Sequence, residues 1–229
     1  MAKSKQLVIF GSQEMAKLAR YYFEQDSAYS VVAFTVDDDS EAKELDGLPL
    51  LPWDEAVRRF PPGDAEMFIA LSYRGLNRLR ADKFDKAKAA GFRLATYVCS
   101  KSVSWPDLVI GENCFVLENQ TLQPTVTLGN NVYLWSGNHI GHGTRIADHT
   151  YLASHVVVSG HCNIGERCFI GVNTTLRDFI TIGNDCFIGM DASVTQDLPE
   201  GSVALGAPAT VHGPDDRVAR MLKRKYFGS

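Results

Sequence analysis

Between Ile110 and Val194, every sixth residue is aliphatic. The series has fifteen members without an insertion: Ile110, Val116, Leu122, Leu128, Leu134, Ile140, Ile146, Leu152, Val158, Ile164, Ile170, Leu176, Ile182, Ile188 and Val194. Chance does not explain this run, because these aliphatic residues make up only roughly a fifth of an average sequence. The strict six-residue period restricts this half of the chain to a repeat architecture.

The hexads predict a parallel β-helix in which each repeat is a short strand followed by a corner. Three hexads close one triangular coil, so fifteen hexads make five coils and residues 18 apart stack on one another. With ~4.8 Å between coils, the prism is roughly 24 Å tall. The position four residues after each aliphatic residue is usually small. Four of the five cysteines occupy it, so we expect them to be buried hydrophobic side chains rather than reactive thiols.

The first half of the chain has a different pattern, in which apolar runs alternate with helical periodicity. Strands are predicted at 7–12, 30–37, 67–72 and 93–99, and helices around 15–22 and over 77–90. This alternation favours a small parallel α/β sheet with right-handed crossovers. The sequence of residues 215–227 predicts one more helix. This helix could cover the end of the prism as a cap, or its basic side chains could bind phosphates, and we favour the cap.

Charge and composition exclude several classes of protein. The net charge is −4, so no basic surface indicates binding to nucleic acid. The apolar run at the N-terminus is too short for a signal peptide, and no stretch is long enough to cross a membrane. An odd number of cysteines without a CxxC pair indicates neither a disulfide framework nor a zinc ribbon. We expect a cytoplasmic protein that binds neither nucleic acid nor membrane.

Five of the six histidines fall between positions 139 and 161: His139, His142, His149, His155 and His161. A β-helix wall does not require such a cluster, which indicates function for the cluster as a whole, although a solvated face explains any single member. In the hexad frame His142 stacks beside Gly160, which leaves room for a ligand. A zinc site built from His139, His142, His161 and Cys162 is a weaker alternative, because residues three apart point to different sides of a strand. We expect no metal.

The predicted sheet carries a second candidate site where its strands end. Gly11, Ser12 and Gln13 join the first strand to a helix, and a helix N-terminus is a place where phosphate binds. Asp37 and Asp38 end the second strand, where an acidic side chain suits ribose hydroxyls or a base edge. A single glycine makes this motif weak, and a purely structural domain is the alternative.

The hexad frame, the LGAPA segment at 205–209 and the α/β region in front together resemble the sialic acid and bacillosamine acetyltransferases, which modify sugars for bacterial surface polysaccharides and glycans. The resemblance covers residues 5 to about 210. It implies an α/β Rossmann-like nucleotide-sugar-binding domain (1–100), a left-handed parallel β-helix that binds acetyl-CoA (101–212) and a C-terminal helix or tail (213–229). The left-handed sense follows from the resemblance and not from the spacing.

The resemblance also implies roles for particular residues. It places the general base at His142 within NHIGHG (138–143), with His139 as second choice. A neutral imidazole can accept the proton that the amine loses as it attacks the thioester. A backbone N–H near Gly160 can donate a hydrogen bond to the oxyanion that forms. The sequence departs from the family pattern at two positions. The family usually has an acidic residue directly after the base, where this chain has Gly143, and a second histidine nine residues after the base, where this chain has Tyr151. Asn138, Asp178 or a residue of a neighbouring subunit is left to orient His142.

Acetyl-CoA is implied as co-substrate, lying along the prism wall between subunits of a homotrimer. The positions implied for it are Tyr151, Gly160, Phe169, Val172, Met190, Gly206, Ala207 and Pro208. The nucleotide of a nucleotide-linked amino sugar is implied at the ends of the first strands, with Ser72 lining its site. We therefore predict transfer of acetyl to the amine of a nucleotide-linked 4-amino-4,6-dideoxy sugar. Acetylation of a sugar hydroxyl and a non-catalytic nucleotide-sugar scaffold are the alternatives.

Overall fold

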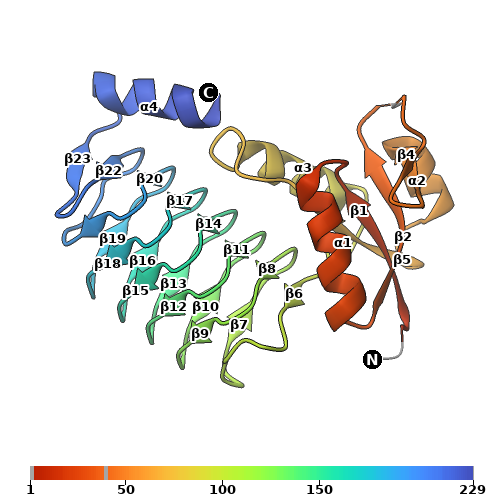
Figure 1. The fold of residues 1–229 in the computed structure, drawn as a ribbon, viewed down its shortest axis with the longest axis horizontal. Coiled ribbons are helices and arrows are strands. Elements are labelled where there is room, and N and C mark those ends of the chain that lie inside the picture. Colours follow the sequence, from red (N-terminus) through yellow and green to blue (C-terminus); the bar gives the residue numbers. More distant parts are fainter. Residues whose placement is uncertain (1–2, 39–40, 229) are drawn as a thin grey trace. The chain divides into compact units, whose positions relative to one another are not determined.

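A computed structural model describes residues 3–38 and 41–228 of the chain (Figure 1). The chain divides into two compact units. The first consists of Met1–Ser72 and Arg80–Tyr97, and the second of Tyr73–Leu79 and Val98–Ser229. In the described part, no helix is both long and apolar enough to cross a membrane.

The first unit is built on a five-stranded sheet. In spatial order its strands are β3 (Glu44–Leu45), β4 (Leu48–Pro52), β2 (Tyr29–Val36), β1 (Lys5–Phe10) and β5 (Ala65–Ile69). β4, β2, β1 and β5 are parallel, whereas β3 pairs antiparallel with β4. The sheet is therefore mixed, which corrects the prediction of a wholly parallel one.

Three helices accompany these strands: α1 (Glu14–Asp26), α2 (Trp53–Arg59) and α3 (Arg78–Ala89). The structure confirms α1 and α3 at the predicted positions and adds α2, which was not predicted. α1 buries Ala16, Ala19 and Phe23, the apolar stripe of an amphipathic helix on a sheet. The predicted strand at 93–99 is wrong as a sheet member. Leu94 forms only an isolated bridge to Met67, and Tyr97–Val98 (β6) belongs to a β-helix sheet.

The second unit is a β-helix with three faces, each a sheet named here by its first strand. The strands of each sheet are parallel, except that β23 pairs antiparallel with β22. The β7 sheet contains β7 (Val109–Ile110), β10 (Thr127–Leu128), β13 (Arg145–Ile146), β16 (Asn163–Ile164) and β19 (Thr181–Ile182). The β9 sheet contains β9 (Thr121–Leu122), β12 (His139–Ile140), β15 (Val157–Val158), β18 (Thr175–Leu176) and β21 (Ser193–Val194). The β6 sheet contains β6, β8 (Phe115–Val116), β11 (Tyr133–Leu134), β14 (Tyr151–Leu152), β17 (Phe169–Ile170), β20 (Phe187–Ile188), β22 (Val203–Leu205) and β23 (Thr210–His212).

The hexad prediction is confirmed in register and burial. Residues 18 apart pair directly, as Thr127 pairs with Arg145 and Arg145 with Asn163. The aliphatic residue of each hexad ends a two-residue strand. From Val116 to Val194 all of these residues are at most 2% exposed and form one continuous core. All five cysteines are buried thiols, as expected for small core side chains.

The corners of the prism need a left-handed backbone. The third residue after each aliphatic position from Ile110 to Ile188 has positive φ. Glycine, asparagine, aspartate and histidine tolerate this conformation better than most residues. His149, His155 and His161 occupy three such corners, with φ of 64°, 61° and 57°. Part of the histidine cluster therefore has a structural cause, and His142 lies outside that pattern.

A C-terminal helix, α4 (Arg217–Phe227), completes the second unit. Its buried Ala219 and Phe227 pack with Phe187 and Val203, side chains of the last coils of the β6 sheet. The segment Tyr73–Leu79 joins the same cluster through Leu76. These contacts add side chains to one edge of the β-helix, where the pocket described below lies.

Candidate active site

His142 lies on an outer corner of the prism, in the turn between β12 and β13. Its side chain is exposed, as a group that meets a substrate must be. The main-chain N–H of His142 donates to Gln123 Oε1 at 2.9 Å, and the ring Nδ1 lies 3.0 Å from the same oxygen. One side-chain oxygen from the preceding coil therefore holds both the backbone and the ring of His142.

This contact fixes the tautomer of the ring. A backbone N–H only donates, so the Gln123 atom facing it is the carbonyl oxygen and not the amide nitrogen. An amide oxygen only accepts, so the Nδ1 of His142 must carry the proton. In the neutral ring Nε2 then holds the lone pair and is free to accept a proton. Gln123 is the orienting residue that the sequence left open.

Two glycines shape the wall beside this ring. A Cβ at Gly160 would lie 2.9 Å from Cε1 and 3.1 Å from Nε2 of His142, so only glycine lets the ring rest there. A Cβ at Gly141 would lie 2.6 Å from the Gly160 nitrogen. Within residues 3–38 and 41–228, no acceptor pairs with the Gly160 N–H. The equivalent N–H of Asn130 donates to Asp148 Oδ1. His142 thus stands beside an open backbone donor.

Asn138, a predicted partner of His142, and His139, the second-choice base, are placed elsewhere. Asn138 is buried, donates to the Trp135 carbonyl at 2.6 Å and accepts from the Val156 N–H at 2.7 Å, so it supports the backbone and does not orient the imidazole. His139 is the first residue of β12 and is half-buried between Thr121 and Val157.

An apolar pocket of about 450 Å³ lies on a different edge of the β-helix, along the β6 sheet and the turns that follow its strands. Its lining consists of Tyr73, Ala153, Phe169, Gly171, Val172, Phe187, Gly189, Met190, Leu205, Gly206, Leu222, Tyr226 and Phe227. Val172 and Met190 are 42% and 67% exposed, so apolar surface remains open to a ligand. Tyr73 and the α4 side chains were not predicted, because nothing in their own spacing places them at this edge.

The eight positions predicted for acetyl-CoA divide into two groups. Four of them line the pocket: Phe169, Val172, Met190 and Gly206. The others lie outside its lining. Tyr151 is buried with its ring stacked on Phe169 at 5.4 Å, Gly160 lies against His142, and Ala207 and Pro208 are exposed.

His142 and the apolar pocket lie on different edges of one prism. The pocket follows the edge between the β6 and β9 sheets, and His142 stands at the edge between the β9 and β7 sheets. The β9 sheet separates them and presents Val157, 41% exposed, on its outer face.

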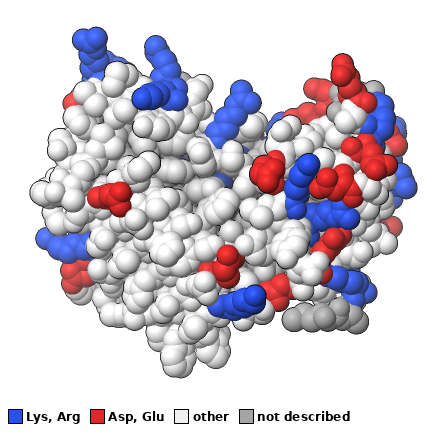
Figure 2. Space-filling view, viewed as in Figure 1, with Lys and Arg blue, Asp and Glu red and all other residues white. Residues whose placement is uncertain are grey.

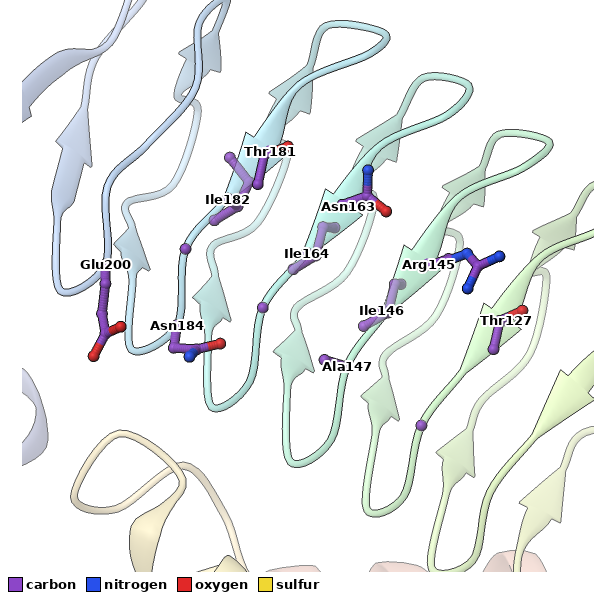
Figure 3. Close-up of a pocket in the computed structure, with 13 residues that line it drawn as sticks. Thr127, Arg145, Ile146, Ala147, Asn163, Ile164, Thr181, Ile182, Asn184 and Glu200 are labelled. Carbon is purple, nitrogen blue, oxygen red and sulfur yellow. The ribbon is translucent and has the colours of Figure 1, made fainter.

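A second hollow, about 500 Å³ in volume, lies on the β7 sheet (Figure 3). Thr127, Arg145, Asn163 and Thr181 project from successive strands along it. Asn184 at its border is engaged in the fold, since its Oδ1 accepts from the Glu166 N–H at 2.8 Å. This hollow is slightly larger than the apolar pocket, but it is an open sheet face and no histidine lines it, so we do not assign the chemistry to it.

The predicted nucleotide site lies in the first unit. Gly11 has φ of 132°, and a Cβ there would lie 2.8 Å from the Ala70 carbonyl oxygen, so this turn requires glycine. Gln13 is the N-cap of α1 and makes no side-chain cap hydrogen bond. Ser12 is half-buried, and so is Ser72, which lies three residues after the end of β5.

Asp37 lies after β2 and is not a free carboxylate. Lys83 Nζ is 2.7 Å and Lys86 Nζ 2.9 Å from its oxygens. Partial burial raises the pKa of Asp37, but the hydrogen bonds from the two lysines outweigh it and hold this pKa below its ordinary value. Lys86 also lies 4.4 Å from the Trp53 ring centre. Two lysines that the sequence did not single out thus bring positive charge to this site, while Asp38 remains exposed.

Positive charge also gathers on α4. Arg217, Arg220, Arg224 and Lys225 border a hollow on its outer side. The face of the β-helix shown in Figure 2 is otherwise largely uncharged. In the described part of the chain, no three His, Cys, Asp or Glu side chains are grouped to hold a metal ion, so the zinc alternative finds no site there.

Comparison with known proteins identifies the repeats. The bacterial transferase hexapeptide family (six repeats) matches residues 125–160 and 161–196, inside the β-helix and around His142. Residues 125–196 are therefore hexapeptide repeats of the kind found in bacterial transferases. No curated protein matches the chain by sequence. Solved structures, however, match about nine tenths of its length.

One such structure is a mutant of perosamine N-acetyltransferase from Caulobacter crescentus in complex with CoA and GDP-perosamine. It is 27% identical, with a TM-score of 0.80, and the match covers 91% of this chain and 97% of that one. The acetyltransferase domain of PglB from Neisseria gonorrhoeae is 22% identical, with a TM-score of 0.80 and coverage of 90% and 99%. WeeI from Acinetobacter baumannii is 20% identical, with a TM-score of 0.70 and coverage of 91% and 100%. These likenesses span the α/β unit as well as the hexapeptide repeats.

Proposed function

We propose that this chain transfers an acetyl group from acetyl-CoA to the amino group of a nucleotide-linked amino-dideoxy sugar, with His142 as the general base. The observation that carries the proposal is the held imidazole: Gln123 accepts the hydrogen bond from Nδ1–H and leaves Nε2 free beside the open Gly160 N–H. The perosamine N-acetyltransferase, solved with CoA and GDP-perosamine, supports this chemistry at 27% identity. Two of its solved forms carry a substituted histidine.

The proposed transfer step uses the imidazole and the backbone donor described above. The amine nitrogen attacks the thioester carbonyl and forms the C–N bond, while Nε2 of His142 accepts the proton that the amine loses. The carbonyl oxygen gains negative charge, and the Gly160 N–H is the donor placed to stabilise it. Collapse of this intermediate breaks the C–S bond, and the CoA thiolate leaves and takes up the proton from the imidazolium. No acyl-enzyme intermediate is required.

The apolar pocket suits the pantetheine arm of acetyl-CoA. It is lined by the apolar side chains of Phe169, Val172 and Met190, and the arm is long and narrow, with methylene and methyl groups on either side of its two amides. The Arg and Lys side chains of α4 lie on the outer side of the helix that forms one wall, and they would favour the phosphates of CoA.

The separation of base and pocket on two edges favours a homotrimer. In a cyclic trimer, one edge of each prism faces a different edge of its neighbour, so His142 of one subunit would meet the pocket of the next. Exposed apolar side chains stand at both edges: Val172 and Met190 at one, Phe179 at the other. Burial of such surface is a common source of stable association.

The α/β unit suits the nucleotide of the acceptor. The turn at Gly11 leads into the uncapped N-terminus of α1, and Lys83 and Lys86 add positive charge at the end of β2. Both features favour a diphosphate. Because Asp37 already pairs with these lysines, we assign it to holding them and not primarily to the ribose.

The test is acetyl transfer by the purified protein. Acetyl-CoA is supplied with a panel of GDP-, UDP- and dTDP-linked amino sugars, GDP-perosamine included, and free thiol and product mass are followed. N-acetylated product supports the proposal. Product from hydroxyl acceptors alone would replace it with O-acetylation, and binding without turnover across the panel would favour a scaffold.

The shared site has its own test. Subunits carrying His142→Ala, which lack the base, are co-expressed with subunits carrying Val172→Trp, whose pocket is filled. Transfer is assayed at acetyl-CoA concentrations well below the wild-type KM, where each variant alone should retain about a tenth of wild-type activity or less. If the site is shared, random mixing leaves about one site in four with an intact base and an intact pocket, and about that share of wild-type activity returns. If each chain contains a complete site, mixing restores nothing.

A further inference from the structure

The ring of His161 lies directly beside that of His142, and nothing in the proposed mechanism accounts for it. The two ring centres are 4.8 Å apart, with planes at 87°, an edge-to-face contact. The His161 N–H also donates to the His142 carbonyl at 2.8 Å. His161 therefore contacts both the ring and the backbone of His142.

His161 is itself held from the next coil. Its ring stacks on Phe179, with centres 5.0 Å apart and planes within 8°. On the other side, a Cβ at Gly143 would lie 2.5 Å from the His161 Nδ1, so only glycine there admits the ring. Phe179 is 70% exposed, so its ring serves no core and its one described aromatic contact is with His161. Three successive coils thus contribute Gly143, His161 and Phe179 to one stack.

We propose that His161, locked between Phe179 and the space above Gly143, is a positioning residue that keeps the His142 ring against Gly160. Gln123 fixes one edge of the His142 ring through Nδ1, but a single hydrogen bond leaves the ring free to swing about that contact. The edge of His161 blocks that swing. This positioning depends on the flat shape of the ring at position 161. An aromatic side chain is therefore required there, but the ionisable nitrogens of histidine are not. This inference rests on His142 being the base.

The experiment compares three substitutions. His161→Ala removes the ring, His161→Phe keeps a flat ring, and His155→Ala is the matched control, since His155 occupies a left-handed corner one hexad earlier and packs over Gly137 as His161 packs over Gly143. Phenylalanine fits this corner, because Phe179 has φ of 60° in the equivalent position one coil on.

With GDP-perosamine and acetyl-CoA, we expect His161→Ala to lower kcat about tenfold with KM nearly unchanged, since misplaced catalytic groups lose rate and not binding. His161→Phe should retain most of kcat, and His155→Ala should match the wild type. A loss in His161→Phe equal to that in His161→Ala would overturn the positioning role in favour of proton transfer by His161. Equal activity in His161→Ala and the wild type would overturn it altogether.

A measurement without turnover separates this inference from the proposed function. Nitrogen-15 NMR of the histidine rings reports which nitrogen of His142 carries the proton. We expect a single Nδ1–H tautomer in the wild type and in His161→Phe, and a mixture of tautomers in His161→Ala. If the wild type transfers no acetyl group, the proposed function fails. If it transfers acetyl but the tautomer of His161→Ala is unchanged, only the role of His161 fails.

Discussion

Gly160→Ala adds one methyl group against the imidazole of His142 and tests the site with the smallest possible change. The new Cβ would lie 2.9 Å from Cε1 and 3.1 Å from Nε2 of the ring. Carbon atoms in ordinary contact are about 3.5–4.0 Å apart, so the ring must retreat by about 0.6–1.1 Å. A displacement near 1 Å at a reacting group costs up to on the order of 100-fold in rate. We expect kcat to fall about 10- to 100-fold, or about 1.4–2.7 kcal/mol of barrier.

The same change should leave the fold nearly intact, because the atoms that must move belong to an exposed side chain and the φ of Gly160 is not positive. The control is Gly213→Ala, where a Cβ meets nothing within 4 Å. Steady-state acetyl transfer and thermal unfolding are measured on both variants. Wild-type kcat in Gly160→Ala would refute the placement of the ring. A parallel drop in Tm by more than about 5 °C would instead attribute the loss to the fold.

Four further substitutions probe other parts of the account. Gln123→Leu removes the acceptor for Nδ1 of His142, so we expect about a tenfold loss of kcat, with Tm within a few degrees of wild type; unchanged kcat would remove Gln123 from the site. Val172→Trp fills the apolar pocket and should raise the KM for acetyl-CoA about tenfold or more while leaving the KM for the sugar unchanged; the reverse pattern would assign the pocket to the sugar. Ile164→Ala leaves a cavity in the prism core and should cost about 2–5 kcal/mol in chemical denaturation, where less than 1 kcal/mol would contradict close packing. The lowered pKa of Asp37 means that its ion pairs stabilise the fold above about pH 4 and are lost as pH falls through that lowered pKa, so Asp37→Asn should flatten this part of the stability curve measured from pH 5 to pH 2.

The β-helix could be predicted from sequence because its order is local and periodic. A single rule, the aliphatic sixth residue, places Ile140, Ile164 and Ile188 in the core, and the coil length of 18 residues follows from it. Stacking at this interval also predicts that Gly160 lies beside His142, as it does. The prediction failed where contacts depart from that interval. Gln123 lies 19 residues from His142 and reaches it diagonally across one coil.

The α/β unit was harder to predict, because its contacts join segments without a shared period. The hairpin of β3 and β4 carried a local signal, since Asp46 and Gly47 form a turn with positive φ at both residues. The lysines on α3 carried none, because their meeting with Asp37 depends on how the helix packs on the sheet. The histidine cluster was partly misleading, because left-handed corners alone account for His149 and His155.

The most direct test of the account is the effect of His142→Ala on acetyl transfer and on acetyl-CoA binding, measured on the same preparation. Removal of a general base typically costs about 10²- to 10⁴-fold in rate. We expect a loss in that range for transfer to an amino sugar, with the Kd for acetyl-CoA unchanged because the apolar pocket lies on another edge of the prism. Turnover at the wild-type rate in this variant would contradict the central role of the imidazole.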